Sequence, residues 1–148
     1  MCFSESIVIK APPEAAFAYL ADPATASIID PAVISYEPDS LPMRQGTRNT
    51  VRVRMYGIPT TMVSQTIEWE EGRRMVIESV QPARPLRGTA THLFEPHPDG
   101  TLYTWSMEMT PTAFGGRLFA RIMTLAMRRN ARKQQVRFKR VMETGSPG

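Results

Sequence analysis

The sequence predicts an α+β protein in which one long carboxyl-terminal helix covers a curved antiparallel sheet of about seven strands. Two observations carry this prediction. The stretch from Thr112 to Thr144 has helical character throughout, and almost everything before it reads as short strands joined by turns. A single helix that covers the apolar face of a strongly curved sheet leaves space between the two layers. The length of 148 residues fits one domain with one sizeable core.

The first elements are a strand followed by two short helices. Ser4–Lys10 alternates loosely and is rich in β-branched residues, which predicts a strand. Pro12-Pro13-Glu14 opens a helix, because proline is tolerated in the first turn and an acid suits the positive end. Asp22-Pro23 ends that helix, and Ala24–Ile29 forms a further turn or two of helix.

Six more strands follow, and period-two alternation between turn signals predicts them. They are Val33–Glu37, a strand after Gly46 that contains Val51, Val53 and Met55, Thr60–Trp69, Arg74–Val80, Gly88–Glu95 and Leu102–Met109. Pro98-Asp99-Gly100 is the strongest turn signal of the chain, and Pro82–Pro85 is a connecting segment. The loop Pro38–Gly46 is expected to lie over an opening.

The apolar face of the terminal helix changes direction along its length. Between residues 114 and 129 it centres on Phe119, Ile122, Met123 and Ala126, and after Arg129-Asn130 on Ala131, Phe138, Val141 and Met142. At 100° per residue the second set is rotated by roughly a third of a turn. We therefore expect a bend near Asn130 or a helix that rolls across the sheet. Gly115-Gly116 forms either a hinge or the end of the preceding loop.

Positive charge is concentrated in the terminal helix. Residues 1–111 hold nine Arg and Lys against thirteen Asp and Glu, a net of −4, whereas residues 112–148 hold nine against one, a net of +8. This excess indicates either attraction to an acidic partner or a solvated helix face that the macrodipole favours. Aromatic residues do not interleave with the cations outside the apolar face, so we expect no nucleic acid and at most a weak contact with an anionic surface.

Several classes of protein are disfavoured. Cys2 is the only cysteine, so an internal disulfide and a cysteine-rich metal site are excluded. The chain lacks a long apolar run, a secretion-type start and a glycine-rich phosphate loop. The expectations are residues 1–144 as a single ligand-binding domain, residues 145–148 as a disordered tail, a cytoplasmic location, no cofactor or metal, and a monomer or homodimer.

Five stretches of the chain together form a recognisable pattern: SIVIKAPPEAAFAYLADP at Ser6–Pro23, Gly46-Thr47, IEWEEGRRMVIES at Ile67–Ser79, FEPHPDGTLYTWSMEM at Phe94–Met109 and FKRVMET at Phe138–Thr144. In this order they resemble the Bet v 1-like (START/SRPBCC) superfamily, and in particular its polyketide cyclase/dehydrase and lipid-transport branch. The resemblance implies a helix-grip fold that encloses a cavity. Members often carry a tryptophan after the second short helix, where this chain has Ile28-Ile29-Asp30, and the departure implies a reshaped cavity mouth.

If the concave sheet face lines a cavity, alternation assigns the residues that point inward. The predicted lining is Val51, Val53, Met55, Met75, Ile77, Ala90, His92, Phe94, Tyr103, Trp105 and Met107 from strands, closed by Phe119, Ile122, Met123 and Ala126 from the helix. The alternative is that these side chains pack against one another and leave no cavity. Among histidines, His92 alone is predicted to point inward, beside Tyr103 on the adjoining strand.

Three functions remain open from the sequence. The first is binding of a hydrophobic small molecule such as a lipid or polyketide, for transport, sequestration or sensing, with His92 and Tyr103 orienting it. The second is an aromatase/cyclase-type enzyme, as the resemblance allows, with catalytic His92 as general base and Tyr103 as its partner. The third is an interaction protein whose basic terminal helix docks on an acidic partner. A hydrogen-bonded core histidine is the simpler interpretation of His92.

Overall fold

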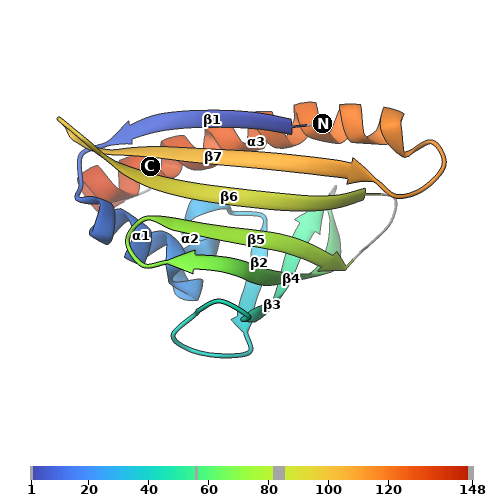
Figure 1. Ribbon diagram of the computed structural model, residues 1–148, viewed down its shortest axis with the longest axis horizontal. Coiled ribbons are helices and arrows are strands. Elements are labelled where there is room, and N and C mark those ends of the chain that lie inside the picture. The colour runs from blue at the N-terminus through green and yellow to red at the C-terminus, as the bar shows by residue number, and fades with distance from the viewer. Residues whose placement is uncertain (1, 56, 82–85, 147–148) are drawn as a thin grey trace.

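The computed structural model describes residues 2–55, 57–81 and 86–146. The predicted connecting segment at 82–85 and the last two residues of the predicted tail lie outside the described residues. The elements, drawn in Figure 1, are β1 (Cys2–Ile9), α1 (Pro13–Ala21), the 3-10 turn η1 (Pro23–Thr25), α2 (Ala26–Ile29), β2 (Val33–Pro38), β3 (Arg48–Met55), β4 (Ile58–Glu70), β5 (Arg74–Gln81), β6 (Leu86–His97), β7 (Gly100–Pro111) and α3 (Gly116–Thr144).

All seven strands form one antiparallel sheet in the order β1-β7-β6-β5-β4-β3-β2. The predicted fold is therefore confirmed: a seven-stranded sheet, short helices after the first strand and one long terminal helix. Neighbouring strands follow each other in the chain, except that the first strand, β1, pairs with the last, β7. No helix in the described part of the chain has the length and apolarity needed to cross a membrane.

The long helix lies along the β1–β7 side of the sheet and contacts those two strands most (Figure 1). It begins at Gly116, later than the predicted Thr112, because β7 continues to Pro111. Gly115 takes a left-handed conformation with φ of 78°. A residue in that conformation cannot be part of an α-helix, so Gly115 ends the loop and Gly116 is the first residue of the helix, and the two are not an internal hinge.

The helix is continuous, and its buried side is a single stripe. The positions buried against the sheet are Gly116, Ala120, Ala131, Gln135, Phe138 and Val141. They follow one another at combinations of three- and four-residue steps, which place them on one face of a helix. The expected bend or roll near Asn130 is therefore not needed, because Phe119 and Ile122 do not belong to the buried stripe.

A chain of aromatic rings forms the centre of the core. Phe17 of α1 meets Phe94 of β6 with ring centroids 5.4 Å apart, Phe94 stacks on Tyr103 at 4.9 Å, and Tyr103 meets Phe138 of α3 edge-on at 5.3 Å. All four side chains are nearly fully buried. Aromatic contacts in these arrangements add to the stabilisation from burial alone. The rings thus fix α1 and the end of α3 to the same place on the sheet, where β6 pairs with β7.

The turn between β6 and β7 requires its glycine. Gly100 has φ of 135°, and a Cβ atom placed on it would lie 2.3 Å from the Ile9 carbonyl oxygen and 2.8 Å from the Ala11 nitrogen. The backbone leaving β1 therefore passes directly over this residue. The next residue completes the junction, because the Thr101 hydroxyl donates to the Ala11 carbonyl at 2.6 Å. The predicted Pro98–Gly100 turn is confirmed and also anchors the start of α1.

Candidate ligand-binding cavity

A cavity of about 200 Å³ lies between the sheet and the α1–α2 segment. It is lined by Leu20, Asp22, Pro23, Ala26, Ile29, Asp30, Val33, Tyr36, Met43, Val51, Met75, Ile77, His92, Trp105 and Gln134. Tyr36 of β2 and Trp105 of β7 face the same space although four strands separate β2 from β7 in the sheet. The sheet must therefore curl strongly, and this curl creates the hollow.

His92 and Tyr103 form a hydrogen-bonded pair on the cavity wall. They occupy neighbouring strands and are diagonal neighbours, two residues off direct register, since His92 pairs with Trp105 and Phe94 pairs with Tyr103. The His92 Nδ1 atom lies 2.7 Å from the Tyr103 hydroxyl oxygen. The Tyr103 hydroxyl hydrogen is paired when it is donated to Nδ1 of His92. In that arrangement the imidazole carries its own proton on Nε2. His92 Nε2–H is then a donor that the cavity can use.

Burial keeps both members of this pair neutral. It lowers the pKa of His92 to about 4, because an imidazolium would lose its hydration among the surrounding rings. Burial also raises the pKa of Tyr103 above its ordinary value. The ring of His92 lies 5.4 Å from that of Trp105 and nearly parallel to that of Tyr103. At neutral pH the pair therefore offers hydrogen bonds without charge.

Two further polar groups belong to this wall. The indole Nε1–H of Trp105 is buried and has no hydrogen-bond partner among the described residues. An unpaired buried donor costs roughly 1–3 kcal/mol, and this atom has almost no accessible surface, so a molecule in the cavity does not contact it directly. Tyr36 also lines the cavity, and burial raises its pKa to about 12, so its hydroxyl is neutral as well. The cavity is thus mainly apolar, with a few uncharged polar groups from three strands.

The rim is held by carboxylates that already have partners. Asp22 accepts a hydrogen bond from the Ala24 backbone N–H at 2.9 Å. Asp30 accepts one from the Ala32 N–H at 3.0 Å and another from the Gln134 side-chain amide at 2.9 Å. These contacts tie the α1–β2 segment to itself and to α3. Both carboxylates therefore hold the backbone around the entrance of the cavity in one conformation.

The structure distributes the predicted strand residues over three environments. Val51, Met75, Ile77, His92 and Trp105 line the cavity. Phe94 and Tyr103 lie in the aromatic core, with Tyr103 also bordering a smaller hollow of about 30 Å³ next to His92. Val53, Met55, Ala90 and Met107 are half-buried on the same strands but do not border the larger cavity. The role of these residues as ligand contacts stays a prediction.

The four helix residues predicted to close the cavity do not line it. Phe119 and Ile122 are 41% and 55% exposed, Ala126 is exposed and Met123 is half-buried. The helix turns its small residues Gly116 and Ala120 toward the sheet at this end, because small side chains let the backbone approach closely. The sequence prediction was based on large apolar residues, and it therefore selected residues away from the face that packs on the sheet. Gln134 is the helix residue that borders the cavity.

Sequence reasoning missed the wall that short segments contribute. Ile29, Val33 and Tyr36 come from α2 and β2, and Met43 comes from the loop that was expected over an opening. Met43 is only 7% exposed, which is unusual for a residue in a loop with this many prolines. Strict alternation would place Val33 and Tyr36 on opposite faces of β2, but a register shift between Val33 and Ser35 brings both to the cavity. Nothing in the sequence indicates that Met43 folds inward.

The comparisons with known proteins agree with this architecture. Residues 1–143 match the sequence model of the family described as polyketide cyclase / dehydrase and lipid transport. No curated protein is similar enough in sequence to be matched with the chain.

Solved structures show the same fold at low sequence identity. Protein TTHA0849 from Thermus thermophilus is 19% identical, with a TM-score of 0.78 over 99% of both chains. The di-domain ARO/CYC protein BexL from the BE-7585A biosynthetic pathway is 18% identical, with a TM-score of 0.79 over 97% of this chain and 50% of BexL. Ara h 8.0201 is 13% identical, with a TM-score of 0.63 over 91% of this chain and 95% of that one. Because the family match runs through nearly every element described above, the chain belongs to the polyketide cyclase/dehydrase and lipid-transport family.

Proposed function

We propose that this protein binds a hydrophobic small molecule in the cavity between the sheet and the α1–α2 segment. The observation that supports this most directly is the combination of an apolar lining with the neutral His92–Tyr103 pair. Apolar burial supplies affinity at about 25 cal/mol per Å², and a few polar groups fix the orientation of a ligand. A carbonyl or ether oxygen on the ligand suits the Nε2–H donor of His92.

The volume limits the size of what is fully enclosed. An engineered apolar cavity of about 150 Å³ holds one benzene molecule, whereas this cavity measures about 200 Å³. Pockets for drug-sized ligands measure roughly 300–1,000 Å³. The ligand is therefore a small ring system, or one end of a longer lipid or polyketide chain whose remainder extends through the rim.

The alternative function is that of an aromatase/cyclase-type enzyme acting on a polyketide-like substrate. It is favoured by the 2.7 Å His92–Tyr103 contact on the cavity wall and by the likeness to a di-domain ARO/CYC protein. A general base works best when its pKa lies near the operating pH. A His92 pKa of about 4 makes the imidazole a weak base, which supports binding and orientation over proton abstraction.

A fluorescent neutral probe, N-phenyl-1-naphthylamine, tests the binding proposal. Ile77→Trp places a large ring in the cavity and is expected to weaken probe binding at least about tenfold, since the ring occupies much of the available volume. Ile67→Trp is the matched control, because Ile67 lies on the neighbouring strand β4 and is 36% exposed. Thermal unfolding of both variants verifies that they fold.

Equal binding by the two variants would mean that the probe sits elsewhere, and the proposal would then fail. Native mass spectrometry of the protein purified from cells is expected to show a co-purifying apolar mass that Ile77→Trp loses. For the enzymatic alternative, His92→Ala must abolish turnover of a poly-β-ketone substrate. If that variant only changes which ligand binds, the protein is a binder.

A further inference from the structure

The first half of α3, residues 116–127, carries apolar side chains on two opposite faces. One face packs on the sheet through Gly116 and Ala120, which are buried. The opposite face is uncovered and presents Phe114 (109% exposed, in the preceding loop), Leu118 (67%), Phe119 (41%), Ile122 (55%) and Leu125 (71%). Clusters of exposed large apolar residues of this kind mark interaction sites on monomeric proteins. We call these five residues the apolar outer face of α3.

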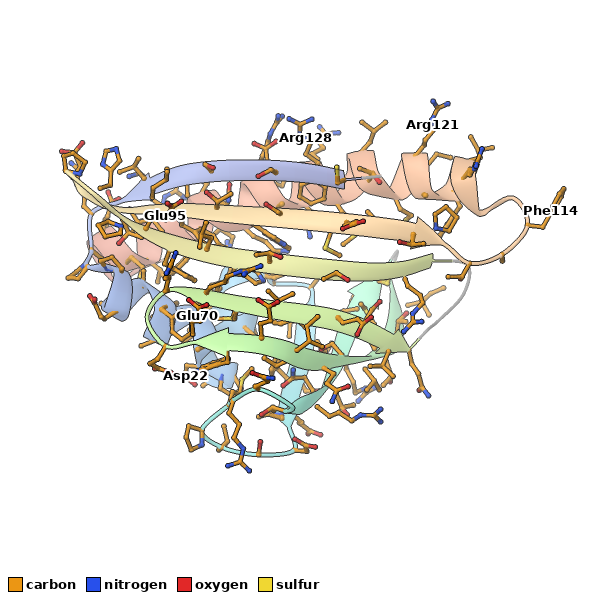
Figure 2. All side chains as sticks on the ribbon, viewed as in Figure 1. Asp22, Glu70, Glu95, Phe114, Arg121 and Arg128 are labelled. Atoms are coloured by element: carbon orange, nitrogen blue, oxygen red, sulfur yellow. The ribbon has the colours of Figure 1, made fainter. Side chains whose placement is uncertain are left out.

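Cations without partners border the apolar outer face. The side chains of Arg117, Arg121, Arg129 and Lys133 make no ion pair or hydrogen bond with any residue that the structure describes. Figure 2 shows Phe114 projecting from the end of the β7–α3 loop and Arg121 pointing outward from the helix. Farther along the same side, Arg132, Lys133, Val136 and Arg137 line a shallow depression. The outer side of α3 thus passes from apolar to basic.

Acidic groups are almost absent from this part of the chain. Between residues 112 and 148, Glu143 is the single acid, and it pairs with Lys139. Glu5 of β1 pairs with Arg128 and Arg132. The charge of +8 in residues 112–148 is therefore neutralised only in small part within the molecule. Among the cations without partners, Arg117 and Arg121 lie next to the exposed residues Leu118 and Ile122 in the helix.

We propose that the outer side of α3 docks on an anionic lipid bilayer. A helix that combines large apolar residues with Arg and Lys lies in the plane of a membrane surface. Its apolar side chains enter the boundary between headgroups and acyl chains, and its cations contact phosphate groups. The apolar outer face and its cations have these two properties side by side. This inference concerns a surface that does not line the cavity and goes beyond the binding of a ligand there.

Charge argues against the other occupants. A two-fold dimer through this surface would place the same patch on both sides of the interface. The cations of one copy would then face the cations of the other, with no acid between residues 112 and 142 to separate them. The phosphates of a nucleic acid would pair with Arg117 and Arg121. They would leave the exposed side chains of Phe114, Leu118 and Leu125 in contact with water. An anionic bilayer matches both kinds of side chain.

Vesicle flotation provides the test. The wild-type protein is expected to float with vesicles of phosphatidylcholine and phosphatidylglycerol, and much less with phosphatidylcholine alone. Leu118→Ser with Leu125→Ser is expected to weaken binding to the anionic vesicles about tenfold or more, since two inserted side chains are lost. Leu41→Ser with Ile58→Ser is the matched control, because these residues are 70% and 66% exposed at other places on the surface. The control is expected to bind like the wild type.

The charge contribution is measured with Arg117→Gln and Arg121→Gln together. Each cation near an anionic surface contributes about 1 kcal/mol, so the double variant is expected to bind roughly tenfold or more weakly. Binding of the N-phenyl-1-naphthylamine probe verifies that the cavity is intact in every variant. Equal flotation of the Leu118/Leu125 variant and its control would overturn the proposal, as would equal binding to neutral and anionic vesicles. A dimer in analytical ultracentrifugation that the Leu118/Leu125 variant abolishes would assign the surface to a second copy instead.

Discussion

The first half of α3 is richer in apolar residues than the second, residues 128–144, yet the second half supplies the helix's share of the core. Phe138 and Val141 belong to the main hydrophobic cluster, and Met142 packs against it. From the first half, only the small residues Gly116 and Ala120 are buried. Apolar content alone therefore does not tell which part of a helix is packed. What decides is whether the apolar residues repeat along the side that meets the sheet.

The two halves also differ in how they are tied to the rest of the protein. The second half makes side-chain hydrogen bonds from Gln134 to Asp30, from Gln135 to the Glu5 carbonyl and from Lys139 to the Val8 carbonyl. In the described part of the chain, no side chain of residues 117–127 makes a hydrogen bond or ion pair outside the helix. The second half therefore anchors α3, and the first half presents a surface.

The strongest test of this comparison replaces one phenylalanine in each half of α3 with alanine. Phe138→Ala is expected to lower the free energy of unfolding by about 3–5 kcal/mol, because a fully buried ring leaves a cavity. Phe119→Ala is expected to change it by less than about 1 kcal/mol, since Phe119 is 41% exposed and alanine favours helix. Urea denaturation of both variants measures the difference. A similar loss from Phe119→Ala would show that the first half is also packed.

A second prediction uses the buried histidine beside the anchored half. His92 borders a small hollow that Gln134, Gln135 and Phe138 of α3 also border. Its folded pKa of about 4 lies below the ordinary value of 6.5. The unfolded chain therefore binds more protons between these values, and stability falls as pH decreases from about 6.5 to about 4. The expected loss is roughly 3 kcal/mol, and it is complete below the folded pKa.

Variants at the two histidines check the origin of this pH dependence. His92→Gln is expected to remove most of the slope in urea midpoints between pH 6.5 and pH 4, while its amide can still accept from Tyr103. His97 lies in the β6–β7 turn with its side chain 31% exposed, so His97→Gln is expected to leave the slope in place. A slope that survives in His92→Gln would show that other groups are responsible.

The same contrast explains how much of this molecule could be predicted from its sequence. Alternation along Leu102–Met109 and its turn at Gly100 predicted that β7 pairs with β6, and with this pairing the neighbourhood of His92 and Tyr103. Those signals are local, because register follows from turn position and pleat. The buried face of the first half of α3 carries no such signal, since glycine and alanine are small and do not stand out as apolar in a hydrophobic periodicity. The contributions of Met43 and Gln134 to the cavity depend on how distant segments close over it.

The smallest expected effect lies at the junction of the two halves. Glu5, with its side chain 15% exposed, pairs with Arg128 and Arg132, and these arginines hold the pKa of its carboxyl below the usual value. Stability from this pair is present above pH 4.5, the ordinary pKa, and is lost as pH falls through the folded value. Glu5→Gln at pH 7 is expected to cost less than about 1 kcal/mol, as for most ion pairs near the surface. The substitution also frees two arginines beside the apolar outer face, so binding to anionic vesicles is expected to strengthen while urea denaturation shows little change. Weaker vesicle binding together with a large loss of stability would mean that Glu5 orders the first half of α3. The half that anchors the helix and the half that presents a surface would then not be separate.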